Sequence, residues 1–91
     1  MVIELDRSRA LWPQVAAIIR ERIEAGTYKP GERIPPVLAL VTEFGVTQVT
    51  VRKAVAALRD DHYIRTETGM GSFVLTPKER EDAQRSADDV R

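Results

Sequence analysis

The chain has 91 residues, and its 14 Lys and Arg balance its 14 Asp and Glu, so the formal net charge is zero. Cysteine is absent and His62 is the one histidine, which excludes disulfides, thiol catalysis and metal sites built from clustered cysteine or histidine. No apolar run approaches the roughly 20 residues of a membrane span, and the charged first nine residues exclude a signal peptide. We therefore expect one small cytoplasmic domain with no metal, no cofactor and no membrane partner. Its neutral charge gives no advance support for a nucleic-acid partner, because domains that bind nucleic acids are usually basic.

The first predicted element is a helix over about 13–25. Pro13 stands in its first turn, where a proline costs no hydrogen bond. Gly26 is typical of the position just past a helix end. The predicted buried stripe repeats at the spacing of an amphipathic helix and consists of Leu11, Val15, Ile18, Ile19 and Ile23.

A second helix is predicted over about 37–44, ended by Gly45. The two proline turn signals before it leave room for a very short strand at Arg33–Ile34. At about 100° per residue, Leu38 falls roughly a quarter-turn off the apolar face of this helix. We therefore expect Leu38 to point outward.

Thr47 is the predicted N-cap of a third helix, which ends near Asp60 and Asp61. The short connection after Gly45 is the spacing of a helix-turn-helix. The predicted inner face is apolar and consists of Val51, Ala54, Val55 and Leu58. The outer face carries amide and cationic groups with no carboxylate before Asp60, and consists of Gln48, Val49, Arg52, Lys53 and Arg59.

Beyond His62 the period changes to that of a β-hairpin, with strands in 63–67 and 72–76 joined by 68–71. Three helices followed by a hairpin predict a mainly α fold with a small β-hairpin (α+β), namely a winged helix-turn-helix of three helices plus a wing. Pro77 closes this globular part. We assign to the core, and to no site, Val15, Ile18, Ile19, Val51, Val55, Leu58 and Phe73.

The last fourteen residues, 78–91, are polar and leave two interpretations open. Their composition cannot bury enough surface to fold alone, which favours a frayed tail. However, Thr76 and Glu79 have the spacing of a capping box around Pro77. A second apolar pattern then follows at i, i+4 and i+7, at Ala83, Ala87 and Val90. This pattern favours a helix that a partner chain stabilises.

From Trp12 to Val74 the sequence resembles the DNA-binding domain of the GntR family of bacterial transcription regulators. Four pieces carry the resemblance in the family's order, namely Leu11–Val15, Pro30–Pro35, Gly45–Leu58 and Gly69–Val74. The resemblance implies a regulator that binds double-stranded DNA as a homodimer on a palindrome, with helix 47–59 in the major groove and wing 68–71 in the minor groove. The implied organisation is an arm over 1–10, a DNA-binding domain over 11–76 and a tail or linker helix over 77–91.

The resemblance also implies the roles of individual residues. Base contacts are expected from Thr47, Gln48, Thr50 and Arg52, with an apolar contact from Leu38. Wing contacts are expected from Thr68, Gly69, Met70 and Gly71. Phosphate contacts are expected from Trp12, Gln14, Lys53 and Arg65.

The sequence departs from the family pattern at three positions near the expected DNA surface. Pro36 replaces the serine that caps the second helix, while Leu38 and Gln48 replace two arginines. Fewer cations release fewer counterions, so we expect a different base preference, or a weaker binder with a shallower salt dependence.

An enzyme and a protein-binding domain are the alternatives to DNA binding. An enzyme is disfavoured because His62 beside Asp61 makes no triad, and Gly69–Gly71 precedes a strand rather than the helix of a nucleotide loop. A winged helix that binds a protein through Leu38 and Val49 is the alternative. The family's effector-binding domain has no counterpart before Arg91, so we expect no small-molecule effector site in this chain. That leaves a stand-alone regulator or a fragment of something longer.

Overall fold

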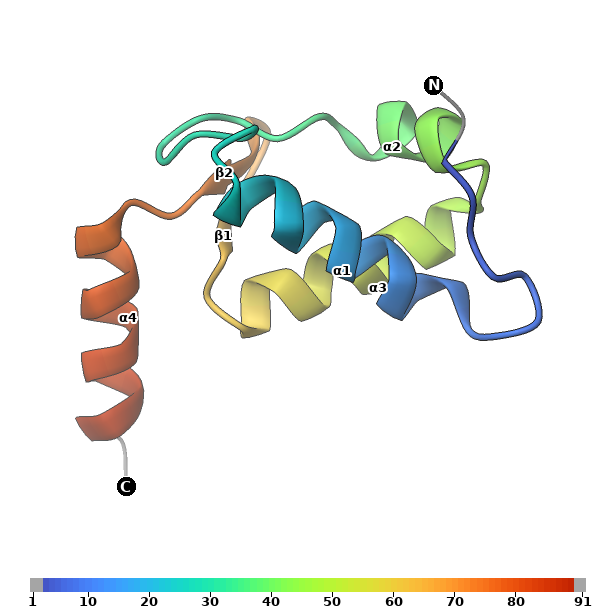
Figure 1. Ribbon diagram of the computed structural model, residues 1–91. Coiled ribbons are helices and arrows are strands. Elements are labelled where there is room, and N and C mark those ends of the chain that lie inside the picture. The colour runs from blue at the N-terminus through green and yellow to red at the C-terminus, as the bar shows by residue number, and fades with distance from the viewer. Residues whose placement is uncertain (1–2, 90–91) are drawn as a thin grey trace.

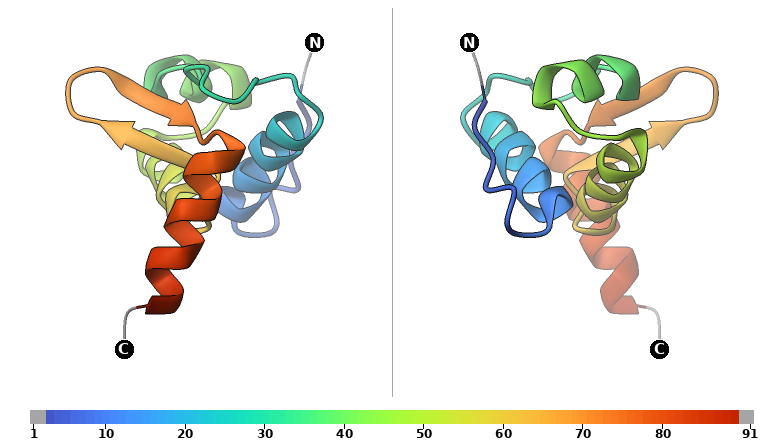
Figure 2. Two further views of the ribbon diagram at one scale, coloured as in Figure 1. Left: turned by 90° about the vertical axis from the view of Figure 1, so that its left-hand side faces the viewer. Right: turned by 90° about the vertical axis from the view of Figure 1, so that its right-hand side faces the viewer.

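The computed structural model describes residues 3–89 and gives that part of the chain the element order of a winged helix-turn-helix (Figure 1). The elements are α1 (Leu11–Glu24), α2 (Val37–Phe44), α3 (Gln48–Asp60), β1 (Ile64–Glu67), β2 (Gly71–Val74) and α4 (Pro77–Asp89). The predicted fold class, three helices followed by a wing, is therefore confirmed. The additional helix is α4, which points away from the helical body (Figures 1 and 2).

Helix α1 begins at Leu11, two residues earlier than predicted, and ends at Glu24. Pro13 is therefore the third helical residue, where a backbone N–H still has no partner within the helix. Past the helix end Gly26 has φ +83°, as a left-handed residue after a helix requires. The N–H of Thr27 then donates to the Arg22 carbonyl at 2.8 Å, which satisfies one of the last free carbonyls of α1.

Helix α2 has the predicted bounds, and Gly45 ends it as predicted. Pro36 precedes it and supplies no side-chain cap. Gly45 ends it in the left-handed conformation at φ +65°, and its N–H donates to the Val41 carbonyl at 2.9 Å. Two residues later the predicted cap forms, because the Thr47 hydroxyl accepts from the Thr50 N–H at 3.2 Å. The helix-turn-helix is thus fixed at both sides of its turn.

The core lies where α1, α2, α3 and the base of the wing meet. Its fully buried members come from every one of these elements and are Val15, Ile19, Leu40, Phe44, Val51, Ala54, Leu58, Ile64 and Val74. Four of the predicted core residues are buried: Val15, Ile19, Val51 and Leu58. Two more, Ile18 and Val55, are half-buried and pack against the cluster.

The placement of Phe73 in the core was wrong. Ile64 pairs with Val74 across the hairpin and both are buried, so the next pair, Arg65 and Phe73, points to the opposite face. There the Arg65 guanidinium lies 5.0 Å from the centre of the Phe73 ring. The alternation of a strand, rather than the apolar character of the residue, decides which side chain is buried.

The loop before α2 adds a third strand-like segment to the wing. The Ile34 N–H donates to the Ser72 carbonyl and the Val74 N–H to the Glu32 carbonyl, both at 2.9 Å. Arg33 thereby lies opposite Phe73 as an isolated bridge. The very short strand predicted at this loop is confirmed, and it ties the wing to the start of the helix-turn-helix.

Helix α4 begins with the predicted capping box. The Thr76 hydroxyl accepts from the Glu79 N–H at 3.2 Å, and the Glu79 carboxylate accepts from the Thr76 N–H at 2.9 Å. Residues 77–89 are therefore helical, and Ala83 is half-buried. The other predicted stripe positions, the Ala87 side chain and Val90, lie outside the part of the chain that the structure describes.

We predict that acid weakens the start of α4. Hydrogen bonding to Thr76, with the charge of Arg65 nearby, lowers the pKa of the Glu79 carboxyl from its ordinary value. A lowered pKa in the folded state means that the charged form stabilises the capped helix at neutral pH, and that this contribution is lost as the pH falls through the lowered value. The ¹³Cα shifts of residues 77–85 should therefore lose helical character as the pH falls through the lowered pKa of Glu79. Glu79→Gln, which can cap without charge, should abolish this pH dependence.

Candidate nucleic-acid interface

The outer face of α3 is exposed, polar and free of acid until the end of the helix. Gln48, Val49, Arg52 and Lys53 are exposed, and Thr50 is half-buried. Among residues 3–89, no hydrogen bond or ion pair engages the side chains of Gln48, Arg52 or Lys53. Their amide, guanidinium and ammonium groups are therefore available to a partner. Seen end-on, the wing extends on the side of α3 opposite α1, so this face and the wing border one side of the molecule (Figure 2, left).

Thr47 and Thr50 have different roles within this face. The Thr47 hydroxyl accepts from the Thr50 N–H and lies 3.1 Å from the Thr50 hydroxyl. Thr47 is therefore engaged as the helix cap, and it orients the Thr50 side chain. When Thr47 donates in that pair, the Thr50 hydroxyl remains free to donate outward. The geometry gives Thr47 a positioning role and leaves Thr50 the better candidate for a base contact.

An exposed apolar residue lies in the first turn of α2. Leu38 is 64% exposed, as predicted from its angle on the helix. Val49, on the outer face of α3, is 62% exposed. Leucine and valine can contact a thymine methyl group but donate no hydrogen bond.

The N-terminal arm holds the helix-turn-helix turn, a role that the sequence did not indicate. Arg7 donates to the carbonyls of Gly45 at 3.0 Å and Phe44 at 3.3 Å. These are carbonyls at the C-terminal end of α2, where a cation is favourable to the helix dipole. The partners are 38 and 37 residues away in sequence. No local pattern could have paired them.

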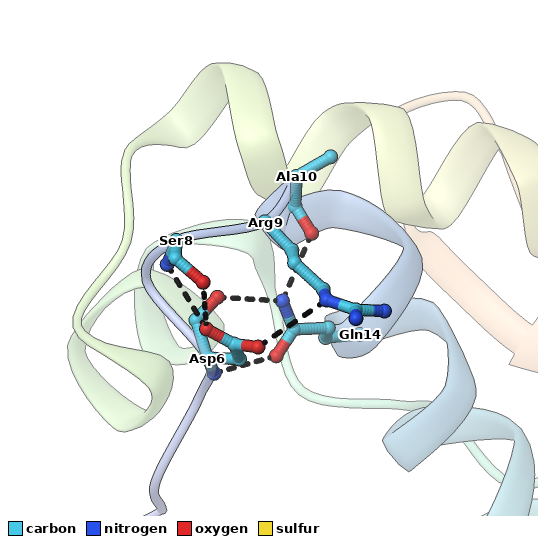
Figure 3. Close-up of polar contacts among 5 residues, drawn as sticks. All are labelled: Asp6, Ser8, Arg9, Ala10 and Gln14. Atoms are coloured by element: carbon cyan, nitrogen blue, oxygen red, sulfur yellow. Dashed lines mark hydrogen bonds and ion pairs between the residues drawn. The ribbon is translucent and has the colours of Figure 1, made fainter.

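Gln14, expected to contact a phosphate, forms hydrogen bonds inside the domain. Its amide oxygen accepts from the Asp6 N–H at 2.7 Å, and its amide nitrogen donates to the carbonyls of Asp6 at 2.9 Å and Ala10 at 3.0 Å. Figure 3 shows the side chain turned into the arm. Both donor hydrogens are therefore occupied, and Gln14 fixes the arm against the start of α1.

Trp12 lies near two acidic side chains at the C-terminal end of α3. It is 37% exposed and lines a shallow groove together with Ala57, Asp60 and Asp61. These three residues stand at the C-terminal end of α3, whereas the expected base contacts begin at its N-terminal end. Arg20 also lines this groove, so the charge around Trp12 is mixed. The phosphate contact of Trp12 stays a prediction.

The wing tip has the backbone that its glycines predict. Gly69 has φ +77° and Gly71 has φ +112°, and the turn is closed by the Met70 N–H donating to the Glu67 carbonyl at 2.9 Å. Thr68 and Met70 are exposed, Met70 at 61%. The tip therefore presents backbone and one flexible apolar side chain.

Arg65, expected to contact phosphate, is already neutralised within the fold. Its Nε lies 2.8 Å from a carboxylate oxygen of Glu79 on α4, and its Nη1 bonds to Glu67. The Nε contact is close but poorly aligned as a hydrogen bond, so we treat it as an ion pair. Two carboxylates and the Phe73 ring surround Arg65, and its guanidinium is oriented toward α4.

Two further arginines lie beside the wing. Arg59 donates to the Thr66 hydroxyl at 3.2 Å and so links the end of α3 to β1. Its place on the outer face of α3 was visible in the helical projection. Arg33 lies on the short strand before α2 and is exposed. Neither residue has a local sequence signal that predicts a contact.

Residues 3–89 contain no group of three or more His, Cys, Asp or Glu side chains placed to hold a metal ion. Within the same range, no helix combines the length and the apolar character that crossing a bilayer would need.

Comparison with known proteins adds three findings. A family model described as "Bacterial regulatory proteins, gntR family" matches residues 11–74. The chain is 42% identical over 66 residues to the mannosyl-D-glycerate transport/metabolism system repressor MngR of Escherichia coli (strain K12), a match that covers 72% of this chain and 28% of that protein. The chain spans about a third or less of the length of curated relatives that it matches.

Two solved structures share the fold. A GntR family transcriptional regulator from Listeria monocytogenes superposes with a TM-score of 0.78 at 26% identity, over 93% of this chain and 80% of that one. The DNA-binding domain of AraR in complex with operator ORE1 superposes with a TM-score of 0.70 at 30% identity, over 78% of this chain and 89% of that one.

Proposed function

The chain belongs to the gntR family of bacterial regulatory proteins, and from this premise we propose that residues 11–76 bind double-stranded DNA in a sequence-specific manner as part of a transcription regulator. The observation that carries the proposal is the outer face of α3, which is exposed and free of carboxylates up to Asp60. The similarity to the AraR domain crystallised with its operator supports the same function.

The proposed docking places α3 in the major groove, which is about 12 Å wide and admits a helix. Arg52 then donates to the acceptors of a guanine, and Gln48 pairs with an adenine edge. Leu38 and Val49, both largely exposed, are suited to thymine methyl groups. The wing tip approaches the minor groove, where Gly69 allows the backbone to come close.

The charge of the surface sets the expected strength of binding. Lys53 and Arg52 are exposed cations of α3, whereas the Gln14 amide and the Arg65 guanidinium are engaged by other groups of the domain. Few phosphate contacts release few counterions. We therefore propose that non-specific binding is weak and that base contacts supply much of the selectivity.

We also propose that two copies bind together on a palindrome. One α3 and one wing read a short half-site, and a symmetric dimer reads two of them about one helical turn apart. Helix α4 is the segment proposed to bring the copies together, because its capped start holds it as a helix that points away from the helical body (Figure 2). Deleting residues 78–91 should reduce the cooperativity of DNA binding. Unchanged affinity and cooperativity would contradict the role of α4.

The experiment that tests DNA binding is selection from duplexes with a random core, at low and at near-physiological salt, followed by fluorescence anisotropy on the enriched pool. Enrichment of a palindrome at the higher salt is the expected result. Binding that disappears with salt and enriches no sequence would contradict sequence-specific recognition.

A protein-binding role is the second candidate, and the exposure of Leu38 at 64% and Val49 at 62% favours it. The two functions differ in their response to salt. Binding to DNA weakens as salt is added, with a slope that grows with the number of phosphate contacts, whereas an apolar protein contact is nearly insensitive to salt. Anisotropy of a labelled duplex across a salt series therefore separates them.

A further inference from the structure

Arg33 lies beside the wing, and the pairing of the short strand before α2 with β2 fixes its backbone position. Arg33 is fixed in the backbone of the short strand, because the residues on either side of it, Glu32 and Ile34, hydrogen bond to β2 at 2.9 Å. It stands opposite Phe73 in the register. Its side chain therefore starts from a rigid point on the wing and not from a free loop.

The Arg33 side chain runs along the wing toward the tip. An added Cβ at Gly71 would lie 2.8 Å from the Arg33 Nε, 3.4 Å from Cζ and 3.5 Å from Cδ. Gly71 is two residues nearer the tip than Phe73, the residue that Arg33 faces. The guanidinium thus occupies the space that any other residue at position 71 would fill. The glycine at 71 serves this close approach as well as its own φ of +112°.

The charge of Arg33 is not neutralised within the described part of the chain. None of the ion pairs among residues 3–89 includes Arg33, which is exposed. The nearest acid in the register is Glu67, opposite Gly71, and Glu67 bonds to Arg65. Arg65 itself is shared between Glu67 and Glu79. Of the two arginines that flank Phe73, only Arg33 presents an uncompensated positive charge.

We infer that Arg33 is the phosphate-binding cation of the wing, in the place for which the sequence suggested Arg65. The inference rests on the proposed DNA binding and adds a positioning contact to it. When the wing tip enters the minor groove, a guanidinium that lies along the wing comes close to the DNA phosphates that border this groove. Such a contact fixes the orientation of the domain and reads no base.

The salt dependence of DNA binding tests this inference, because each phosphate contact contributes about 0.9 to the slope of log K against log salt. Fluorescence anisotropy would use a labelled random-sequence duplex of about three helical turns, with the wild-type chain and the variants Arg33→Gln, Arg33→Lys and Arg65→Gln. Arg33→Gln should flatten the slope by about 0.9 for each bound copy. Arg33→Lys should keep the slope, since lysine binds phosphate as a point charge.

Arg65→Gln is the matched control, since it removes the same charge from the same face of the wing. It should leave the slope unchanged, because Arg65 is already paired with two carboxylates. Thermal unfolding by circular dichroism checks that all variants fold. A wild-type slope in folded Arg33→Gln would overturn the inference while leaving DNA binding intact. A folded wild-type chain that binds no duplex would overturn both.

Discussion

Replacing Phe44 by alanine is expected to lower the free energy of unfolding by about 3–5 kcal/mol. Phe44 is the last residue of α2, is 1% exposed and packs in the core with residues of α1 and α3. The Arg22 guanidinium lies 5.3 Å from its ring centre. Natural domains have a total stability of about 5–15 kcal/mol, and a chain of this size stands at the low end. The variant should therefore be largely unfolded at 37 °C. Urea and thermal unfolding followed by circular dichroism measure the loss.

Leu38→Ala is the matched control on the same helix. Leu38 is 64% exposed, so its truncation should change the unfolding free energy by no more than about 0.5 kcal/mol. A larger loss in Leu38→Ala than in Phe44→Ala would mean that α2 presents the opposite face to the core. The same Leu38→Ala protein then serves the DNA-binding experiments, because its fold is intact.

The elements of this fold could be predicted where local signals decide them. Gly45 and the apolar period of 37–44 fix α2, and the structure has the predicted bounds. Thr47 caps α3 because its hydroxyl reaches an N–H three residues away, which is a purely local contact. The start of α1 was placed too late, at Pro13. The first turn of a helix needs no internal hydrogen bonds, so Leu11 and Trp12 could precede the proline.

The partners of polar side chains could not be predicted in the same way. A helical period tells which face a residue occupies, but not what approaches that face from a distant segment. Gln14 is bound by the arm through Asp6, and Arg65 by α4 through Glu79. Both residues were therefore assigned to phosphate on a resemblance alone, and the structure gives each of them an internal role. Arg7 illustrates the reverse case, since its contact with Gly45 spans 38 positions and has no local signal.

The wing shows why strand residues need the register as well as the pattern. Phe73 is apolar and neighbours the buried Val74, so sequence alone could not tell which of the two points inward. The pairing of Ile64 with Val74 decides it. The same register places Arg33, Phe73 and Arg65 side by side on the outer face. Arg65 is paired with two carboxylates and Arg33 with none in the described part of the chain, and this difference in pairing becomes visible only once the register is known.

Replacing Arg52 by alanine is expected to weaken specific DNA binding by about 1–3 kcal/mol, or about 5- to 150-fold. Arg52 is exposed on the outer face of α3, between the cap at Thr47 and the acidic end at Asp60. A guanidinium in this position can donate two parallel bonds to a guanine, and alanine leaves both acceptors unpaired. Anisotropy on the selected palindrome measures the loss.

Two comparisons separate base recognition by Arg52 from a general loss of charge or of fold. On a random-sequence duplex the variant should lose only the smaller effect of one cation, so the ratio of specific to non-specific affinity must fall. Arg9→Ala removes the same charge from the N-terminal arm, where the Arg9 Nε lies 3.5 Å from an Asp6 carboxylate oxygen, and should change specific binding little. Because Arg52 lies off the buried stripe of Val51, Ala54 and Leu58, the thermal transition of Arg52→Ala should match that of the wild type. A lost transition would show that Arg52 supports the fold, and an unchanged specificity ratio would remove it from the base contacts.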